Sequence, residues 1–156
     1  MAKRTAETVA PFQGTDLRLD YALAGGFFED ADVGTERRGT SRDLALAAGL
    51  DNLTQAIANR LKTRQGELAP LGHPTYGSRH HELIGEPNVP RTRNLIKLYV
   101  LQALRDEPRI ERVLRADVRA EHEPPRDVVR IEIEARVTGQ ATPLNLVVPF
   151  SLGVGV

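Results

Sequence analysis

Cysteine is missing from this 156-residue chain, and its absence removes several classes of protein at once. Without thiols there is no disulfide framework, no cysteine nucleophile and no cysteine-bound zinc. Residues 1–10 lack the apolar core of a signal peptide, and no stretch approaches the roughly 18 apolar residues that a membrane span requires. We therefore expect a protein without membrane insertion that is made, and first assembled, in the cytoplasm.

Aromatic residues and net charge are also scarce. The chain has no Trp and only three Tyr and four Phe, so its core must be built mainly from Leu, Val, Ile and Ala. Such a lean core predicts a subunit that gains part of its stability from neighbours, because a partner that binds the folded state stabilises it. The 21 basic and 21 acidic residues cancel, so no long-range field favours nucleic acid or an anionic membrane as a partner.

The first third of the chain predicts two short strands separated by a loop. Residues 1–15 show no periodicity and are expected to form a flexible extension, with 16–152 as a single domain. Alternating apolar residues over 17–23 predict a half-buried strand, and 42–47 predicts another, with its two Leu on one face. Between them, Phe27 to Thr40 predicts a polar loop, whose two Phe either fold back onto the core or anchor an interface.

The most regular local signal is a helix that begins at Asp51. Its carboxylate can accept hydrogen bonds from the first free backbone amides, and apolar residues recur every four positions from Leu53 to Leu61. Gly66 offers a C-terminal stop. An irregular, rigid connection is expected over 68–77, where Pro and Gly are frequent.

Two further helices are predicted before residue 110. Ser78 can cap a short helix that ends at Ile84, and a longer one runs from about Arg91 to Asp106, where Pro108 ends it. Apolar residues cover most of the circumference of the longer helix. It is therefore expected to be buried on several sides.

The C-terminal third, residues 110–150, predicts a three-strand β-meander. Apolar and charged residues alternate over 114–120 and, more strictly, over 129–137, with Pro124-Pro125 and Gly139 at the turns. Opposite charges on neighbouring strands are expected to face each other on the outer surface of this sheet.

A third strand, 144–150, completes the meander. It contains Pro149, which cannot donate to a ladder and therefore belongs on an edge or at a strand end. Strands followed by helices and then by strands predict an α+β fold, with helices packed on one face of a small, mainly antiparallel sheet.

The sequence shows no constellation that indicates catalysis or metal binding. Adjacent His80 and His81 would point about 100° apart on a helix, and no carboxylate follows at the spacing of a zinc helix. The best carboxylates for a glycosidase pair are Glu67, Glu82 and Glu86, and no apolar pocket around them is evident that would raise a pKa. We expect no catalytic residues, no metal and no cofactor.

One tripeptide lies at a structural boundary. Glu107-Pro108-Arg109 is placed where an apolar helix stops and a strand begins, and Pro108 fixes the chain direction there. The acid and the base then flank a bend, in a position suited to charge-assisted contacts with another chain. The alternative interpretation, an ordinary helix stop with two solvated charges, stays open on these three residues alone.

Several short motifs occur in an order that resembles one protein family. They are Asn52-Leu53-Thr54-Gln55-Ala56-Ile57, Arg60-Leu61-Lys62-Thr63, Gly66-Glu67-Leu68, Gly72-His73-Pro74-Thr75-Tyr76-Gly77 and Glu107-Pro108-Arg109. The ordered set resembles the GPW-type baseplate wedge family, the sheath initiators of contractile phage tails and contractile injection systems. The resemblance runs from about Asp43 to Leu152, and the last strand, 144–150, is similar to that of particle-type injection systems.

The resemblance implies a structural protein, present in six copies per baseplate, that nucleates the contractile sheath and has no catalytic task. Its implied partners are the sheath protein and the larger baseplate wedge proteins, with inner tube, spike and hub proteins as further candidates. After assembly it would be part of the baseplate of a phage tail or tail-like injection particle. Some members carry a lysozyme name, which the lack of a carboxylate pocket argues against here.

The resemblance also assigns roles to residues of this chain. Wedge docking is implied for Glu107, Pro108 and Arg109. The resemblance implies that arms of the sheath subunits complete an open sheet of this protein, a case of β-augmentation. The strand residues implied to pair with them are Arg130, Ile131, Glu132, Ile133, Glu134, Leu144, Asn145, Leu146, Val147 and Val148. A structural role in the family motifs is implied for Gln55, Arg60, Leu61, Thr63, Gly66, Glu67, Pro74, Tyr76 and Gly77.

Two other functions stay open at the level of sequence. One is a peptidoglycan hydrolase, and the other is a free-standing module that captures one extended peptide by β-augmentation. The loop at 27–40 and the first 15 residues depart from the family pattern, so the resemblance implies no contacts for either.

Overall fold

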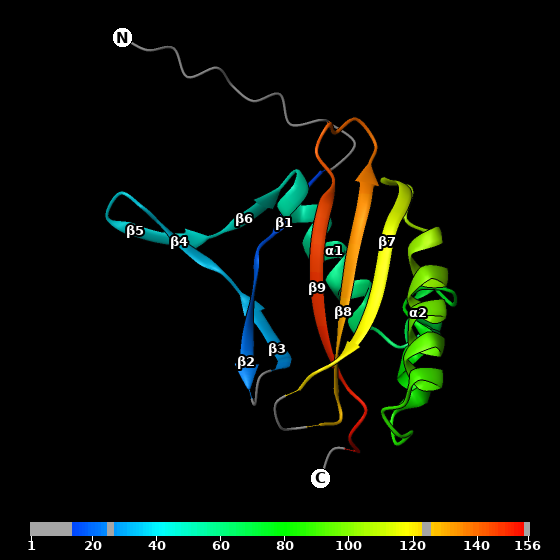
Figure 1. Cartoon of the computed structure of the whole chain (residues 1–156). Coiled ribbons are helices and arrows are strands. Elements are labelled where there is room, and N and C mark those ends of the chain that lie inside the picture. The colour runs from blue at the N-terminus through cyan, green and yellow to red at the C-terminus, as the bar shows by residue number, and fades with distance from the viewer. Residues whose placement is uncertain (1–13, 25–26, 123–125, 155–156) are drawn as a thin grey trace.

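A computed structural model of the chain describes residues 14–24, 27–122 and 126–154, and for 22–24 and 27–30 it describes the backbone only. Within these residues, a three-stranded sheet backed by two helices lies beside three small two-stranded units (Figure 1). The predicted turn at Pro124-Pro125 lies outside the described residues.

The three-stranded sheet is the predicted C-terminal meander. Strands β7 (Ile110–Ala120), β8 (Val128–Val137) and β9 (Leu144–Ser151) pair antiparallel in the order β7-β8-β9, which confirms the prediction. The register of β7 shifts near Ile110 and again between Val113 and Arg115. A β-bulge of this kind interrupts the alternation, and it leaves Leu114 37% exposed.

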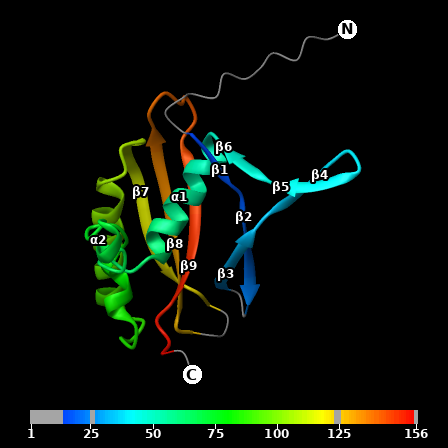
Figure 2. The ribbon, with the colours of Figure 1, turned by 180° about the vertical axis from the view of Figure 1, so that it is seen from behind.

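Two helices cover one face of this sheet, as expected for the predicted α+β fold. Helices α1 (Leu50–Lys62) and α2 (Pro90–Arg105) lie on the same side, with α2 along β7 and α1 along β9 (Figure 2). The core forms between the helices and the inward face of the strands. Its fully buried members include Leu53, Ile57, Leu61, Ile96, Val100, Leu104, Val129 and Ile131.

The ends of the helices differ from the sequence prediction. Helix α1 begins at Leu50, after Gly49 at φ 61°, so Asp51 lies in the first turn and does not cap it. It ends at Lys62, well before Gly66. The chain leaves the helix there because the backbone of Thr63 becomes extended and its carbonyl accepts a hydrogen bond from the Ser78 amide at 2.9 Å.

Helix α2 is buried on fewer sides than predicted. Ile96, Val100, Ala103 and Leu104 face the core, whereas Leu98 is 47% exposed. Because the sheet covers only one side of the helix, its apolar residues on the other side remain at the surface.

The predicted polar loop at 27–40 is wrong, because most of it is strand. Strand β2 (Leu19–Ala24) pairs with β3 (Phe27–Val33), and β4 (Thr35–Arg38) pairs with β5 (Ser41–Leu44). A third pair joins β1 (Thr15–Leu17) to β6 (Leu46–Ala48). The side chains of Phe27 and Phe28 are outside the description, so neither interpretation of this pair is tested.

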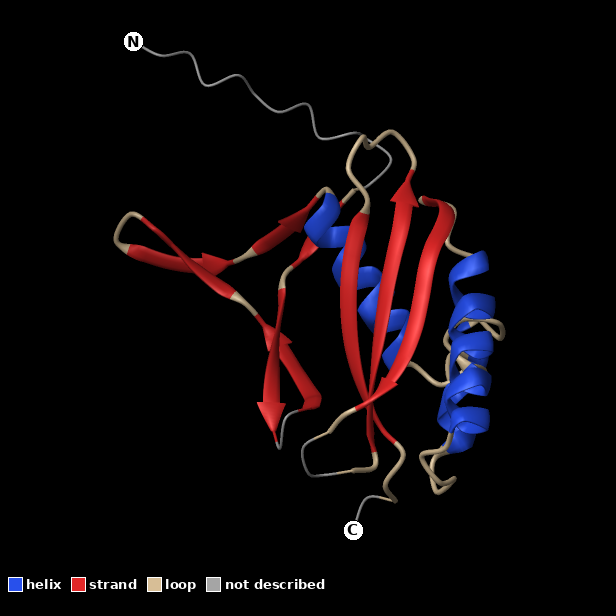
Figure 3. Ribbon diagram, in the orientation of Figure 1, coloured by secondary structure: helices blue, strands red, loops and turns tan. Residues whose placement is uncertain are grey.

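Each of the two strands predicted in this region is divided into two. The breaks fall at Arg18 and Ala45, which join Gly34 in a closed triangle of backbone hydrogen bonds of 2.7–2.8 Å. The three units meet at this junction, where the chain passes from one strand pair to the next (Figure 3). A side chain in place of Gly34 would displace two side chains, because a Cβ would lie 2.8 Å from Nε of Arg18 and 2.9 Å from a carboxylate oxygen of Asp20.

Two short 3-10 helices lie between α1 and α2. The first, Ala69–Leu71, is part of the predicted irregular connection, and the second, Arg79–Leu83, occupies the place of the predicted short helix. Ser78 does not cap the latter, because its hydroxyl contacts Nδ1 of His80 at 2.7 Å.

Candidate functional site

The free edge of β9 is the first feature of functional interest. Strand β8 lies between β7 and β9, so Arg130 to Glu134 have neighbours on both sides and offer no open ladder. In the described part of the chain, β9 pairs only with β8. Of the two strands expected to pair with sheath arms, only β9 has a free edge. Its residues in that expectation are Leu144, Asn145, Leu146, Val147 and Val148.

The side chains of β8 instead stabilise the outer face of the sheet. Glu132 lies 3.5 Å from the guanidinium groups of both Arg115 and Arg119 on β7, and Arg130 lies 3.8 Å from Glu121. These are the opposite-charge contacts that the alternation predicted.

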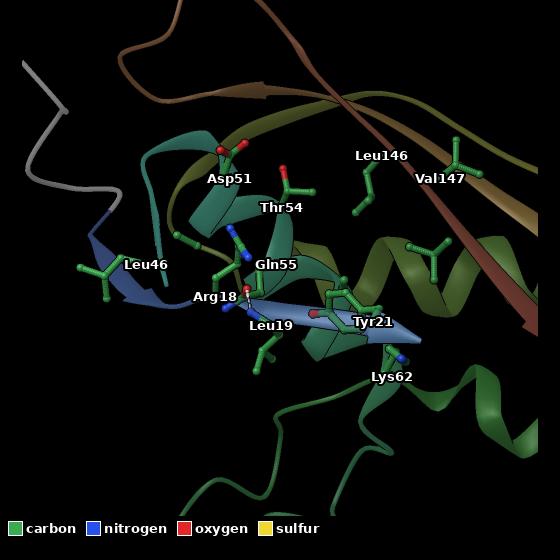
Figure 4. A pocket seen from close by; sticks show the side chains of 13 residues that line it. Arg18, Leu19, Tyr21, Leu46, Asp51, Thr54, Gln55, Lys62, Leu146 and Val147 are labelled. Atoms are coloured by element: carbon green, nitrogen blue, oxygen red, sulfur yellow. Dashed lines mark hydrogen bonds between the residues drawn. The ribbon is translucent and has the colours of Figure 1, made fainter. Parts of the chain in front are cut away.

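A groove of about 390 Å³ runs beside β9. Leu146, Val147 and Val148 form one wall, and α1 contributes Thr54 and Gln55 among other residues. The facing side comes from β2, β6 and the break between β1 and β2, and these lining residues are Arg18, Leu19, Tyr21, Leu46 and Ala47 (Figure 4). An extended segment placed here would meet the β9 backbone on one side and apolar side chains on the other.

Polar contacts to α1 hold the facing side of the groove in place. The amide of Gln55 accepts a hydrogen bond from the Leu19 N–H at 2.7 Å (Figure 4). It also donates one to the Leu17 carbonyl at 2.8 Å. The hydroxyl of Tyr21 contacts Oδ1 of Asn59 at 2.7 Å. Gln55, predicted as a motif residue, is therefore the clamp that fixes the β1–β2 break against α1.

A buried ion cluster surrounds the Glu107 carboxylate. Arg109 donates to it from Nε at 2.6 Å and from Nη2 at 3.1 Å, and Nη2 of Arg60 lies 3.7 Å away. Burial acts to raise the pKa of Glu107, but the hydrogen bonds and charge of Arg109, together with the charge of Arg60, outweigh it and lower the pKa. Glu107 is only 4% exposed, and its carboxylate is bonded by Arg side chains of its own chain.

Two other motif residues, Tyr76 and Gly77, support this ion cluster. Tyr76 lies under the guanidinium of Arg60, 4.5 Å from the ring centroid. The turn that delivers Tyr76 depends on Gly77, which has φ +101° and would place a Cβ 2.6 Å from the Thr63 carbonyl oxygen. Motifs separated by up to 50 residues therefore converge at one place, which local spacing could not predict.

Motif residues around this turn have distinct structural positions. Leu61 is in the core, and Glu67 accepts a hydrogen bond from the Arg64 amide at 3.1 Å. Gly66 has φ 90°, the left-handed region that favours glycine. Pro74 is exposed in the loop.

A cleft of about 420 Å³ opens next to the ion cluster. It is lined by Glu107, Pro108 and Arg109 on one side and by Gly14, Thr15, Asp16 and Asn52 on the other. Pro108 is exposed, and the Arg109 side chain is 19% exposed. The tripeptide thus presents its Pro and Arg at the surface while its acid is buried.

None of the carboxylates considered for catalysis is buried. Glu82 is exposed and bound to Arg79 at 3.0 Å, and the hydrogen bond from that guanidinium lowers the pKa of Glu82 rather than raising it as a general acid requires. Glu67 is also exposed. Across the described ranges no group of His and acidic residues has the arrangement of a metal site, and no helix is long and apolar enough to cross a membrane.

The model of one family, described as baseplate wedge protein gp25, matches residues 47–142. The chain belongs to this family. It is a baseplate wedge component of the gp25 type, which confirms the resemblance carried by the ordered motifs. The match leaves out residues 14–46, which hold β1 to β5, and residues 143–154, which hold β9.

Solved structures share the fold. A Geobacter sulfurreducens protein whose name describes it as a tail lysozyme has a TM-score of 0.57 and 31% sequence identity, over 67% of this chain and 92% of that one. A chain in the baseplate complex from the type VI secretion system has a TM-score of 0.50 and 21% identity, over 64% of this chain and 89% of that one. No curated protein sequence matches the chain.

The sequence analysis named Gln55 and Leu146 to Val148 but missed the residues on the facing side of the groove. Tyr21 and Asn59 are 38 positions apart, and Leu19 and Gln55 are 36 apart. The only early signal was the alternation at 17–23, which indicated that Tyr21 faces the interior.

Proposed function

We propose that this gp25-family protein joins the baseplate wedge to the contractile sheath and starts sheath assembly by accepting a strand at β9. The observation that carries the proposal is the open edge of β9 beside an apolar groove. An arm of a sheath subunit would add to the edge through backbone hydrogen bonds and place alternate side chains in the groove.

The residues at the β9 edge support the addition of a specific strand and limit pairing with unrelated strands. Val147 is 43% exposed, and Leu146 and Val148 line the same groove. Pro149 lacks a backbone donor, and β3 approaches β9 without joining its ladder. Both features limit pairing with an unrelated strand, which exposed sheet edges otherwise invite.

The exposed part of the Glu107-Pro108-Arg109 bend supports the second half of the role, docking to larger wedge proteins. Glu107 would not contact the partner. It would hold the Arg109 guanidinium beside the open cleft, where Pro108 and Arg109 are available to an incoming helix or loop.

The protein acts in this role as a structural part, in six copies around the tube, with no reaction to catalyse. The lysozyme name of the Geobacter sulfurreducens relative raises the hydrolase alternative. It has a simple test, in which purified protein and a Glu67→Gln variant are incubated with peptidoglycan. Clearing by the unmutated protein alone would favour the hydrolase, and no clearing by either supports the structural role.

A substitution at Val147 tests the strand-docking role. Removing all of β9 would not, because Leu144, Val148 and Phe150 belong to the core. Val147→Asp places a charge on the exposed wall of the groove, next to Glu132 on β8. We expect baseplates that assemble normally but carry no sheath in electron micrographs.

The matched control for this experiment is Leu98→Asp. Leu98 is exposed to a similar extent, 47% against 43%, but it lies on α2 and does not line the groove. Sheaths of normal length on Val147→Asp baseplates would contradict the proposal.

A further inference from the structure

The β4–β5 hairpin stands apart from the rest of the fold. It projects away from the sheet and helices (Figures 1 and 3), and its turn at Gly39 and Thr40 is exposed. It also lies outside the part of the chain that matches the family. An isolated two-stranded hairpin is marginally stable in water, so this one gains from a surface to pack against.

The two faces of the hairpin differ in charge. On one face Glu36 and Asp43 are opposite each other, and Arg38 bonds to Glu36 at 2.8 Å while its pKa is raised by that hydrogen bond and by the charges of both acids. On that face the one Arg already has acidic partners.

The other face carries an unbalanced pair of cations. Arg37 and Arg42 are direct cross-strand partners, and like charges in this position destabilise a hairpin. Among the described residues neither Arg forms an ion pair. Leu44, 47% exposed, follows Arg42 on the same face. Two guanidinium groups beside an exposed Leu form a surface that fits an acidic patch on a protein.

The neighbouring β2–β3 hairpin provides such a patch. Asp20 and Asp32 are direct cross-strand partners there. Tyr21, the next residue after Asp20, points to α1 and bonds Asn59, so alternation along the strand turns Asp20 away from α1 (Figure 4). Arg18 pairs with Asp20 at 3.0 Å, which leaves Asp32 without a cation among the described residues.

The acidic character extends over the whole segment that precedes the basic hairpin. Residues 15–33 contain five acidic residues and one basic residue, whereas 35–44 contains three Arg and two acidic residues. The chain as a whole is neutral, so this separation of charge is local.

We infer that copies of this protein associate head to tail, with the Arg37, Arg42 and Leu44 face of one copy docked on the Asp20 and Asp32 face of the next. The Arg37 and Arg42 pair would gain acidic partners, and Asp32 would gain a cation. A contact between two different surfaces repeats from copy to copy and closes into a ring when the rotation allows. The inference is independent of strand addition at β9, because it uses neither β9 nor its groove.

Sedimentation velocity at low and high salt tests this association. We expect the wild-type protein to self-associate at about 0.05 M salt and to dissociate at about 0.5 M, since exposed charges are screened. Arg37→Glu with Arg42→Glu, and separately Asp20→Lys with Asp32→Lys, should each weaken association at least about tenfold. An equimolar mixture of these two reversed proteins should associate again, because each then finds its complement.

A matched control reverses two Arg that lie elsewhere. Arg91→Glu with Arg105→Glu changes the net charge equally on exposed positions of α2, and it should leave association unchanged. A wild-type protein that stays monomeric at low salt, or a mixture that fails to associate, would overturn the inference.

A second measurement remains valid even where charge reversal disturbs folding. Arg37→Lys with Arg42→Lys keeps the charge and allows a carbodiimide to join the introduced amines to carboxylates of a second, isotopically labelled copy. Crosslinks between copies that map to Asp20 or Asp32 are expected. Crosslinks only within one copy, or only to acids elsewhere, would refute the head-to-tail contact and point to a different acidic partner.

Discussion

At the scale of single residues, the Glu107 carboxylate determines how the Glu107-Pro108-Arg109 tripeptide works in this chain. Its sequence position suggested an acid available to another protein, but Arg109 and Arg60 surround it within the fold. A lowered pKa means that its stabilising effect is fully present above the ordinary pKa of a carboxyl group. That effect is lost as the pH falls through the lowered value.

Replacing this carboxylate should therefore destabilise the protein. We expect Glu107→Gln to lower the free energy of unfolding by about 3 kcal/mol, because two guanidinium groups lose their partner in a largely buried place. Urea unfolding measures this change. Glu36→Gln removes the same group from the exposed pair with Arg38 and should have a much smaller effect, because solvent screens that pair. Equal effects of the two substitutions would contradict the buried-cluster account.

At the scale of elements, the short helix Arg79–Leu83 connects to β9 through two His rings. His80 is 1% exposed, and its ring lies 4.5 Å from that of Phe150, while His81 lies 5.5 Å from the same ring and contacts the Leu61 carbonyl at 2.8 Å. Burial, with a smaller effect of His81, lowers the pKa of His80 to about 3. The packing of this helix on β9 therefore requires a neutral His80.

This requirement predicts a pH-dependent stability. Between pH 6.5 and 3 the unfolded chain binds a proton at His80 and the folded chain does not, so the free energy of unfolding falls as the pH falls, by about 1.4 kcal/mol per unit from this group. Denaturant unfolding between pH 4 and 6 gives the free energy of unfolding at each pH. For His80→Gln this free energy should change with pH less steeply than for the wild type, by about 1.4 kcal/mol per pH unit. The exposed His122→Gln serves as control. An unchanged slope in His80→Gln would contradict the account.

The elements also differ in how far the sequence could predict them. The meander and both long helices follow from periodicity, because one face of each is buried against a continuous core. The strands within 27–40 could not be predicted, because the side chains of β4 are exposed or half-buried, and nearby the exposed Leu44 and Leu46 flank the buried Ala45. That pattern is set by the three-way junction at Arg18, Gly34 and Ala45, which joins distant residues.

The candidate sites were predictable to different degrees for the same reason. Family motifs indicated Gln55, Arg60 and Tyr76 as structural residues, but only the fold shows that Gln55 clamps the groove and that Tyr76 supports the ion cluster. Strand pairing was expected on two strands, and only the fold shows that β8 is the central strand whereas β9 is at an edge of the sheet.

At the scale of the whole molecule, α1 links the two proposed docking surfaces. Gln55 and Thr54 face the β9 groove, while Asn52 lines the cleft beside Glu107 and Arg60 contacts that carboxylate. A single rigid helix thus fixes the strand acceptor relative to the wedge-docking bend. This arrangement would let the wedge set the position at which the first sheath subunits bind.

Hydrogen exchange on β9 tests this central proposal most directly. In the free protein, the amides of Leu144 to Val148 that do not bond to β8 should exchange fast, because their edge is open. Adding the sheath protein of the same particle should slow exchange of these amides at least about tenfold, with little change along β7. Binding of the sheath protein with protection confined to β7 or to the β4–β5 hairpin, and none on β9, would contradict the account.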